Sequence, residues 1–144
     1  MCLLSQQDIR VEVEKIIEEN KVGTMATIKN NRPHTRFMTF FHEDLTLYTA
    51  TSTETDKVEE VEENPYTHIL IGYQGEGYGD QYVDYHGKVS INNSEELKQK
   101  LWTDNMAPWF DGPQDPAYTI LEIKPELVRL MPNQTGEEPK EVQL

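Results

Sequence analysis

Two basic residues of this acidic chain, Arg36 and Lys57, occupy positions where a positive charge suggests that an anion is bound nearby. The chain has 26 acidic and 13 basic residues, and Arg36 is one of only four arginines. In the alternation of an extended strand, Arg36 shares one face with Met38 and Phe40. A guanidinium among apolar side chains requires an anionic partner. Lys57, the second cation, follows a segment rich in hydroxyl groups.

That hydroxyl-rich segment leads into a predicted helix, and its side chains are those of Thr49, Thr51, Ser52, Thr53 and Thr55. Free backbone N–H groups and the helix dipole attract phosphate at such a position, and Lys57 falls in the first turn. In one interpretation, Arg36 and Lys57 hold one phosphate from two sides. In the other interpretation, Arg36 pairs with a carboxylate, the threonines have structural roles in the strand and at the helix N-cap, and Lys57 faces solvent.

Other chemistries have weaker support. The glycine-rich segment 72–79 lacks the lysine of a phosphate loop and is not followed directly by a helix, so it predicts a hairpin loop. The four histidines, at 34, 42, 68 and 86, show no His-x-His or His-Glu-x-x-His spacing, and we predict no metal site. No serine has the context of a nucleophile elbow.

Charge and composition exclude several partners. A net charge of −13 repels nucleic acid and anionic lipid. No run approaches the ~20 apolar residues of a membrane span, and we expect no membrane contact. The single cysteine, Cys2, offers no internal disulfide. We therefore expect a cytoplasmic protein.

The elements that position these residues are mainly strands. Ser5 and Asp8 predict the start of a helix over 6–20, and a short helix follows Thr55 with Val58 and Val61 facing inward. Six strands are expected at 24–28, 34–41, 45–50, 67–73, 82–91 and 118–131, with turns at 29–33 and 42–44 and a helix capped by Asn93 and Glu96. This predicts one mainly β domain over 1–132, a barrel with flanking helices, and a disordered tail over 133–144.

The order and spacing of several short segments resemble a known family. The segments are 23–27 (GTMAT), 32–38 (RPHTRFM), 47–49 (LYT), Lys57, Val61 and 64–65 (NP). Together they resemble the flavin-binding split barrel of pyridoxamine 5'-phosphate oxidase-like proteins. Residues 87–89, 101–102, 109–110, 112–113 and 115–116 are similar to its general stress protein 26 branch. The resemblance covers about 6–131.

The resemblance implies a six-stranded antiparallel split barrel that forms a homodimer and holds FMN in clefts at the subunit interface. It implies that Arg36 and Lys57 contact the FMN phosphate. Further cofactor contacts are implied for Phe37, Met38, Thr39, Tyr48, Thr49, Thr55, for Gln81 or its neighbour Tyr82, and for Trp109, which we expect to approach from the other subunit.

Departures from the family pattern bear on the activity. The oxidases commonly carry Ser-Arg-Lys where this chain has Thr55-Asp56-Lys57, and an acid there should weaken phosphate binding. No equivalent of the oxidases' C-terminal substrate-binding arginine and histidine segment is found, so we do not expect oxidation of pyridoxamine phosphate.

The implied function is an FMN-dependent oxidoreductase or flavin carrier with a stress-related role, which takes electrons from NAD(P)H or another donor, and no catalytic acid or base can be named. One alternative is a binding or sensing protein for flavin, haem or a deazaflavin that performs no turnover. Another is a barrel that has lost its cofactor and serves as an interaction module.

Overall fold

The computed structural model describes residues 5–75, 81–132 and 137–144. Its helices are α1 (Gln6–Glu19), α2 (Asp56–Glu63), α3 (Glu95–Leu101) and the short 3₁₀ helix η1 (Asp104–Met106). Its strands are β1 (Val22–Lys29), β2 (Arg32–Thr39), β3 (Phe41–Glu43), β4 (Thr46–Ser52), β5 (Tyr66–Ile71), β6 (Tyr82–Ile91), β7 (Tyr118–Met131) and β8 (Lys140–Glu141). None of the described helices is both long enough and apolar enough to cross a membrane.

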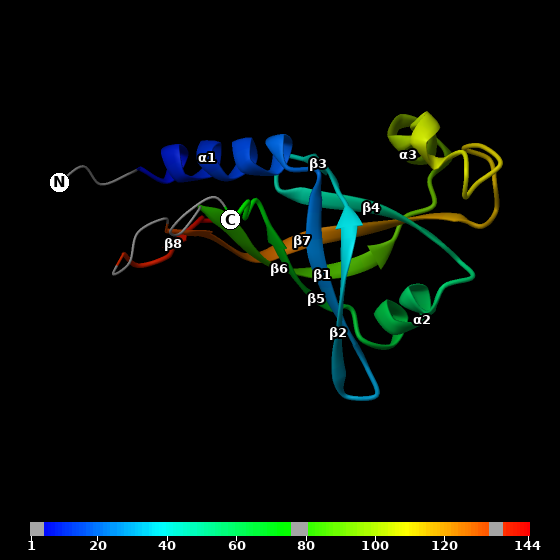
Figure 1. Ribbon diagram of the computed structural model, residues 1–144, viewed down its shortest axis with the longest axis horizontal. Coiled ribbons are helices and arrows are strands. Elements are labelled where there is room, and N and C mark those ends of the chain that lie inside the picture. The colour runs from blue at the N-terminus through cyan, green and yellow to red at the C-terminus, as the bar shows by residue number, and fades with distance from the viewer. Residues whose placement is uncertain (1–4, 76–80, 133–136) are drawn as a thin grey trace.

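The strands form one curled antiparallel sheet in the order β2-β1-β5-β6-β7-β4-β3, with β8 added to β7 (Figure 1). The sheet curls so that β2, at one end of this order, approaches β4 near the other end. There the Thr49 hydroxyl donates to the Thr39 carbonyl at 2.8 Å. This is the split-barrel fold expected from the sequence. It has eight strands where six were predicted, because β3 and β8 are short additions.

The β1–β2 hairpin sets the register of the predicted site residues. Asn30 and Asn31 both have positive φ, at 52° and 62°, as a two-residue type I′ turn requires. The turn places Arg36 opposite Met25, a core residue of β1. Arg36 therefore belongs to the inner face of the sheet, and the neighbouring Phe37 belongs to the outer face.

Helix α1 covers the apolar interior on one side of the sheet (Figure 1). The predicted cap is present as a capping box: the Asp8 N–H donates to Ser5 Oγ at 3.1 Å, and the Ser5 N–H donates to Asp8 Oδ2 at 3.4 Å. The buried side chains of the helix are Ile9, Val13, Ile16 and Ile17. They join the main core cluster inside the sheet. The predicted amphipathic helix is confirmed.

A bulge lets β7 continue past its proline, as the sequence predicted. Pro125 pairs with Gly87 and Leu127 with His86, which leaves Glu126 without an opposite residue on β6. A Cβ at Gly87 would lie 2.6 Å from Ile123 Cγ2, so the close approach of the two strands requires glycine here.

Two local predictions were wrong. The segment 42–44 was expected to be a turn, but His42 and Glu43 belong to β3, which pairs with β4, and only Asp44 has the positive φ of a turn residue. Helix α3 begins after Ser94, whose hydroxyl accepts the Leu97 N–H, in place of the predicted Asn93.

The end of the chain also differs from the prediction. Residues 137–144 were expected to be disordered, but Lys140 pairs with Leu130 and Glu141 with Arg129 in the β7–β8 ladder. Val142 is buried in the main core cluster, and Gln6 hydrogen-bonds to the backbone of Glu141 and Gln143, so both apolar burial and hydrogen bonds hold this segment on the barrel. Residues 133–136 lie outside the described part of the chain, as do Cys2 and residues 76–80 of the predicted hairpin loop.

Candidate functional site

A cleft of about 1170 Å³ opens between β2, β4, the start of α2 and the segment that contains η1. This volume is slightly larger than that of common small-molecule sites, about 300–1000 Å³. Its walls combine hydroxyl groups, two lysines (Lys21 and Lys57) and two acids (Glu54 and Asp104) with apolar and aromatic side chains. The lining residues include Phe37, Met38, Thr39, Phe41, Ala50, Thr51, Ser52, Thr55, Lys57, Met106, Trp109 and Phe110.

Lys57 is the half-buried cation of this cleft. Its Nζ lies 3.8 Å from the Met38 sulfur, and no described carboxylate comes within 4.0 Å of it. Burial, with a smaller contribution from the nearby Arg36 guanidinium, lowers the pKa of Lys57 below its ordinary value. A bound anion would favour the charged ammonium, so Lys57 is arranged to receive an external negative charge.

The start of α2 adds hydrogen-bond donors beside Lys57. Thr55 occupies the N-cap position, but its hydroxyl donates backward to the Ser52 carbonyl at 2.8 Å and lies 3.2 Å from Thr51 Oγ1. The Thr55 side chain therefore makes no cap hydrogen bond to the first N–H groups of this eight-residue helix, and no hydrogen bond to them from another described side chain is present. Uncapped N–H groups at a helix start favour an anion, and three hydroxyl side chains line the cleft at the same place.

Arg36 faces a carboxylate. Its Nη2 lies 3.1 Å from Glu60 Oε2, and its Nη1 donates to Thr27 Oγ1 at 2.8 Å. Thr27 in turn donates to Glu60, whose side chain is only 6% exposed. This is the pairing that the sequence left open as the alternative to phosphate. Arg36 lies beside the cleft, close enough to lower the pKa of Lys57, and its contact with a phosphate stays a prediction.

The structure brings together most of the predicted cofactor contacts. Phe37, Met38, Thr39, Thr55, Lys57 and Trp109 all line the cleft. Tyr48 is buried in a second core cluster under α3, and Thr49 uses its hydroxyl on the Thr39 carbonyl. Gln81 is half-buried outside this cleft, immediately before β6.

Trp109 lines the cleft of its own chain, whereas the family resemblance implied an approach from a second subunit. Its side chain is 75% exposed. The neighbouring Phe110 is buried against Tyr118, with ring centroids 5.1 Å apart, and this contact anchors the segment. Trp109 thus presents a free aromatic surface on a fixed support.

Sequence reasoning missed Phe41, Ala50 and Met106 as cleft residues. Phe41 and Ala50 stand in strands, where no motif marks them, and Met106 lies in a segment without periodicity. The position of that segment depends on the packing of α3 and Phe110 against β7, which no local pattern encodes.

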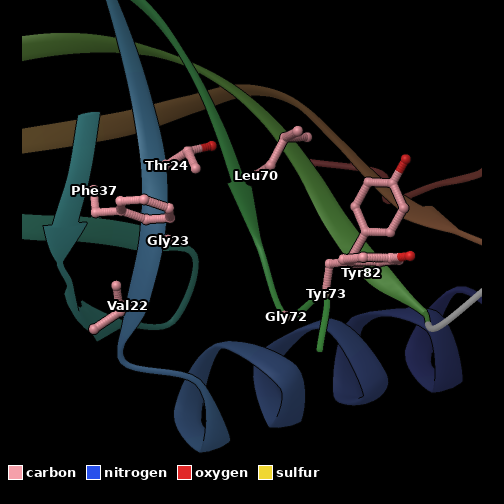
Figure 2. A pocket seen from close by; sticks show the side chains of 8 residues that line it. All are labelled: Val22, Gly23, Thr24, Phe37, Leu70, Gly72, Tyr73 and Tyr82. Carbon is pink, nitrogen blue, oxygen red and sulfur yellow. The ribbon is translucent and has the colours of Figure 1, made fainter. Parts of the chain in front are cut away.

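The outer face of the sheet carries a second, smaller hollow of about 410 Å³ (Figure 2). It is lined by Val22, Gly23, Thr24, Phe37, Leu70, Gly72, Tyr73 and Tyr82. The Tyr73 and Tyr82 rings meet edge to face with centroids 5.9 Å apart. Phe37, 77% exposed, lines both this hollow and the large cleft, so the two are adjacent.

Comparison with known proteins agrees with this geometry. Residues 9–132 match the family model described as Pyridoxamine 5'-phosphate oxidase. General stress protein 26 of Bacillus subtilis (strain 168) is 54% identical over 128 residues, which cover 89% of this chain and 91% of that protein. The crystal structure of the general stress protein 26 from Bacillus anthracis str. Sterne is 32% identical, with a TM-score of 0.80 over 87% of this chain and 95% of its own. A FAD-binding protein from Mesorhizobium loti, 21% identical, shares the fold with a TM-score of 0.67 over 82% and 90% of the two chains.

Proposed function

The chain belongs to the pyridoxamine 5'-phosphate oxidase family, and from that premise we propose that it binds FMN in the large cleft and acts as a flavin-dependent oxidoreductase. The observation that carries the proposal is Lys57, a half-buried cation with no described carboxylate within 4.0 Å, beside an uncapped helix start. A phosphate supplies the charge that this place lacks. The FAD-binding protein of the same fold supports a flavin as the ligand class.

Different residues of the cleft would bind the phosphate and the planar ring of FMN. Lys57, Thr55 and the first N–H groups of α2 would hold the phosphate, and Phe37, Met38 and Trp109 offer apolar surface to a planar ring. When bound, FMN supplies the hydride or electron chemistry, and the protein supplies position and electrostatics. The described lining residues include no histidine or cysteine, which fits a site whose reactive group belongs to its ligand.

The experiment that tests the activity is anaerobic reduction of the FMN-loaded protein by NADH and by NADPH, followed by flavin absorbance. The oxidoreductase proposal expects bleaching that is faster than for the same concentration of free FMN. Inert bound flavin would instead support the alternative of a protein that binds or senses flavin without turnover. We propose a cytoplasmic setting, which agrees with a single cysteine in 144 residues.

We also propose a homodimer in which a second copy covers the outer face of the sheet at the smaller hollow. Its exposed apolar side chains, Val22, Phe37, Leu70 and Tyr73, form a patch that a monomer would leave in water. Phe37 joins this patch to the large cleft, so a partner seated here would also narrow the opening of the cofactor site.

The dimer is tested by placing a charge in the patch. Val22→Arg is expected to shift the protein from dimer to monomer in sedimentation velocity, because Val22 is 55% exposed in this patch and the dimer would bury the arginine charge among apolar side chains. Val11→Arg, at an exposed position on α1, is the matched control and should stay dimeric. A wild-type protein that sediments as a monomer would contradict the proposal.

Asp56 bears on how tightly the phosphate is held. It lies 3.3 Å from Lys29, is mostly exposed, and does not line the cleft, so the weakening expected from the sequence has little structural support. Asp56→Arg should therefore change FMN affinity by less than about fivefold, since exposed charges contribute at most about 1 kcal/mol. The measurement is a fluorescence titration, and a gain of more than tenfold would show that residue 56 reaches the phosphate.

A further inference from the structure

Four charged or polar side chains meet on the outer face of β5, β6 and β7, away from the residues that line the flavin cleft. His68 on β5 stands directly opposite His86 on β6, and Asp84 on β6 stands opposite Arg129 on β7. Asp84 and His86 are two residues apart in one strand, so they share a face of the sheet. Strand register alone brings the four together.

Three of these residues converge as metal ligands do. One ligand atom from each of His68, Asp84 and His86 lies within 4.8 Å of the other two. His68 Nε2 contacts Asp84 Oδ1, and His86 Nε2 lies 3.4 Å from Asp84 Oδ2. The two imidazole rings are stacked, with centroids 4.2 Å apart and an interplanar angle of 22°. The Asp84 side chain is only 4% exposed.

The cluster is not satisfied by its own hydrogen bonds. His86 Nε2 is buried and, although Asp84 Oδ2 lies 3.4 Å away, it makes no hydrogen bond to any described residue. Buried polar atoms without a partner are rare in native proteins, and many of those that occur face a bound ion or water. A bound ion would supply the partner that this buried nitrogen atom lacks.

We propose that His68, Asp84 and His86 bind a divalent transition metal ion, with Zn²⁺ as the first candidate. Two imidazoles and one carboxylate suit this class of ion, and a tetrahedral Zn²⁺ would keep one position for water. The ion would replace the proton between His68 and Asp84 and would give His86 Nε2 its missing partner.

Arg129 acts as a positioning residue for this site. Its Nε and Nη2 lie 3.0 and 2.6 Å from Asp84 Oδ2, and so they fix the carboxylate while Oδ1 faces His68. Hydrogen bonds of this kind to ligating carboxylates orient metal ligands in general. The sequence predicted no metal site because the ligands come from two strands and meet only through the pairing of His68 with His86.

The test is isothermal titration of the full chain with Zn²⁺, repeated with Co²⁺ so that its visible absorption reports the ligand geometry. We expect one ion per chain and an affinity about 100-fold weaker in His86→Ala. His42→Ala is the matched control, because His42 also faces a carboxylate, that of Glu18, elsewhere in the fold. It should bind like the wild type.

Absence of saturable Zn²⁺ binding, or equal binding by His86→Ala and the wild type, would overturn the proposal. A measurement on the unchanged chain guards against a variant that fails to fold. In imidazole ¹⁵N spectra, Zn²⁺ should shift the signals of His68 and His86 and leave those of His34 and His42 in place. Shifts confined to His34 or His42 would also overturn it.

Discussion

Lys57→Ala is expected to weaken FMN binding by about ten- to a hundredfold. The variant removes the one cleft lysine at the start of α2, and with it a charge-assisted contact to phosphate worth ~1.5–3 kcal/mol. Fluorescence titration of the purified variant with FMN and with riboflavin measures the effect. Riboflavin has no phosphate, so its affinity should be the same in the variant and the wild type.

Lys57→Arg and the pH dependence serve as controls for this result. Burial lowers the pKa of Lys57, so wild-type affinity for FMN should fall as pH rises through that lowered pKa and the ammonium loses its charge. Arginine stays charged, and Lys57→Arg should therefore keep its affinity over the same range. If Lys57→Ala binds FMN as tightly as the wild type, the phosphate lies elsewhere.

Arg36→Ala is expected to act first on stability, with a loss of about 2–4 kcal/mol in the free energy of unfolding. Among the residues that the structure describes, the variant leaves Thr27 as the one hydrogen-bond partner of the buried Glu60 carboxylate, and an uncompensated buried charge is strongly destabilising. Urea unfolding followed by circular dichroism measures the loss.

The double variant Arg36→Ala/Glu60→Gln separates the charge from the packing. Neutralising Glu60 should restore much of the stability that Arg36→Ala removes, because glutamine needs no cation. A loss below about 0.5 kcal/mol in Arg36→Ala would contradict the pairing. If the folded double variant binds FMN more weakly than the wild type, this would support the contact between Arg36 and the phosphate that the sequence predicts.

Local signals in the sequence were sufficient for the main elements. The Ser5–Asp8 pair and the spacing of Ile9, Val13 and Ile16 specify α1, and two adjacent asparagines specify the β1–β2 turn. Lys57 could be predicted as a cleft residue because its position after a hydroxyl-rich turn has a physical meaning independent of the rest of the fold.

Features that depend on distant segments could not be predicted. Arg36 meets Glu60, 24 residues later, because α2 turns that acid toward the sheet, and helical spacing alone treats Glu60 as a surface residue. Val142 follows a segment with no hydrophobic periodicity, so its burial in the core could not be predicted from the local sequence. In each case the competing cause is tertiary packing, which overrides local pattern.

Flavin binding by the cleft is tested by a titration of the wild-type protein with FMN and riboflavin in parallel, followed by flavin fluorescence. The flavin proposal predicts saturable binding of FMN, at least about tenfold tighter than that of riboflavin, because only FMN carries the phosphate that Lys57 and the start of α2 would receive. Equal affinity for the two flavins would contradict the phosphate site, and binding of neither would contradict the cofactor itself.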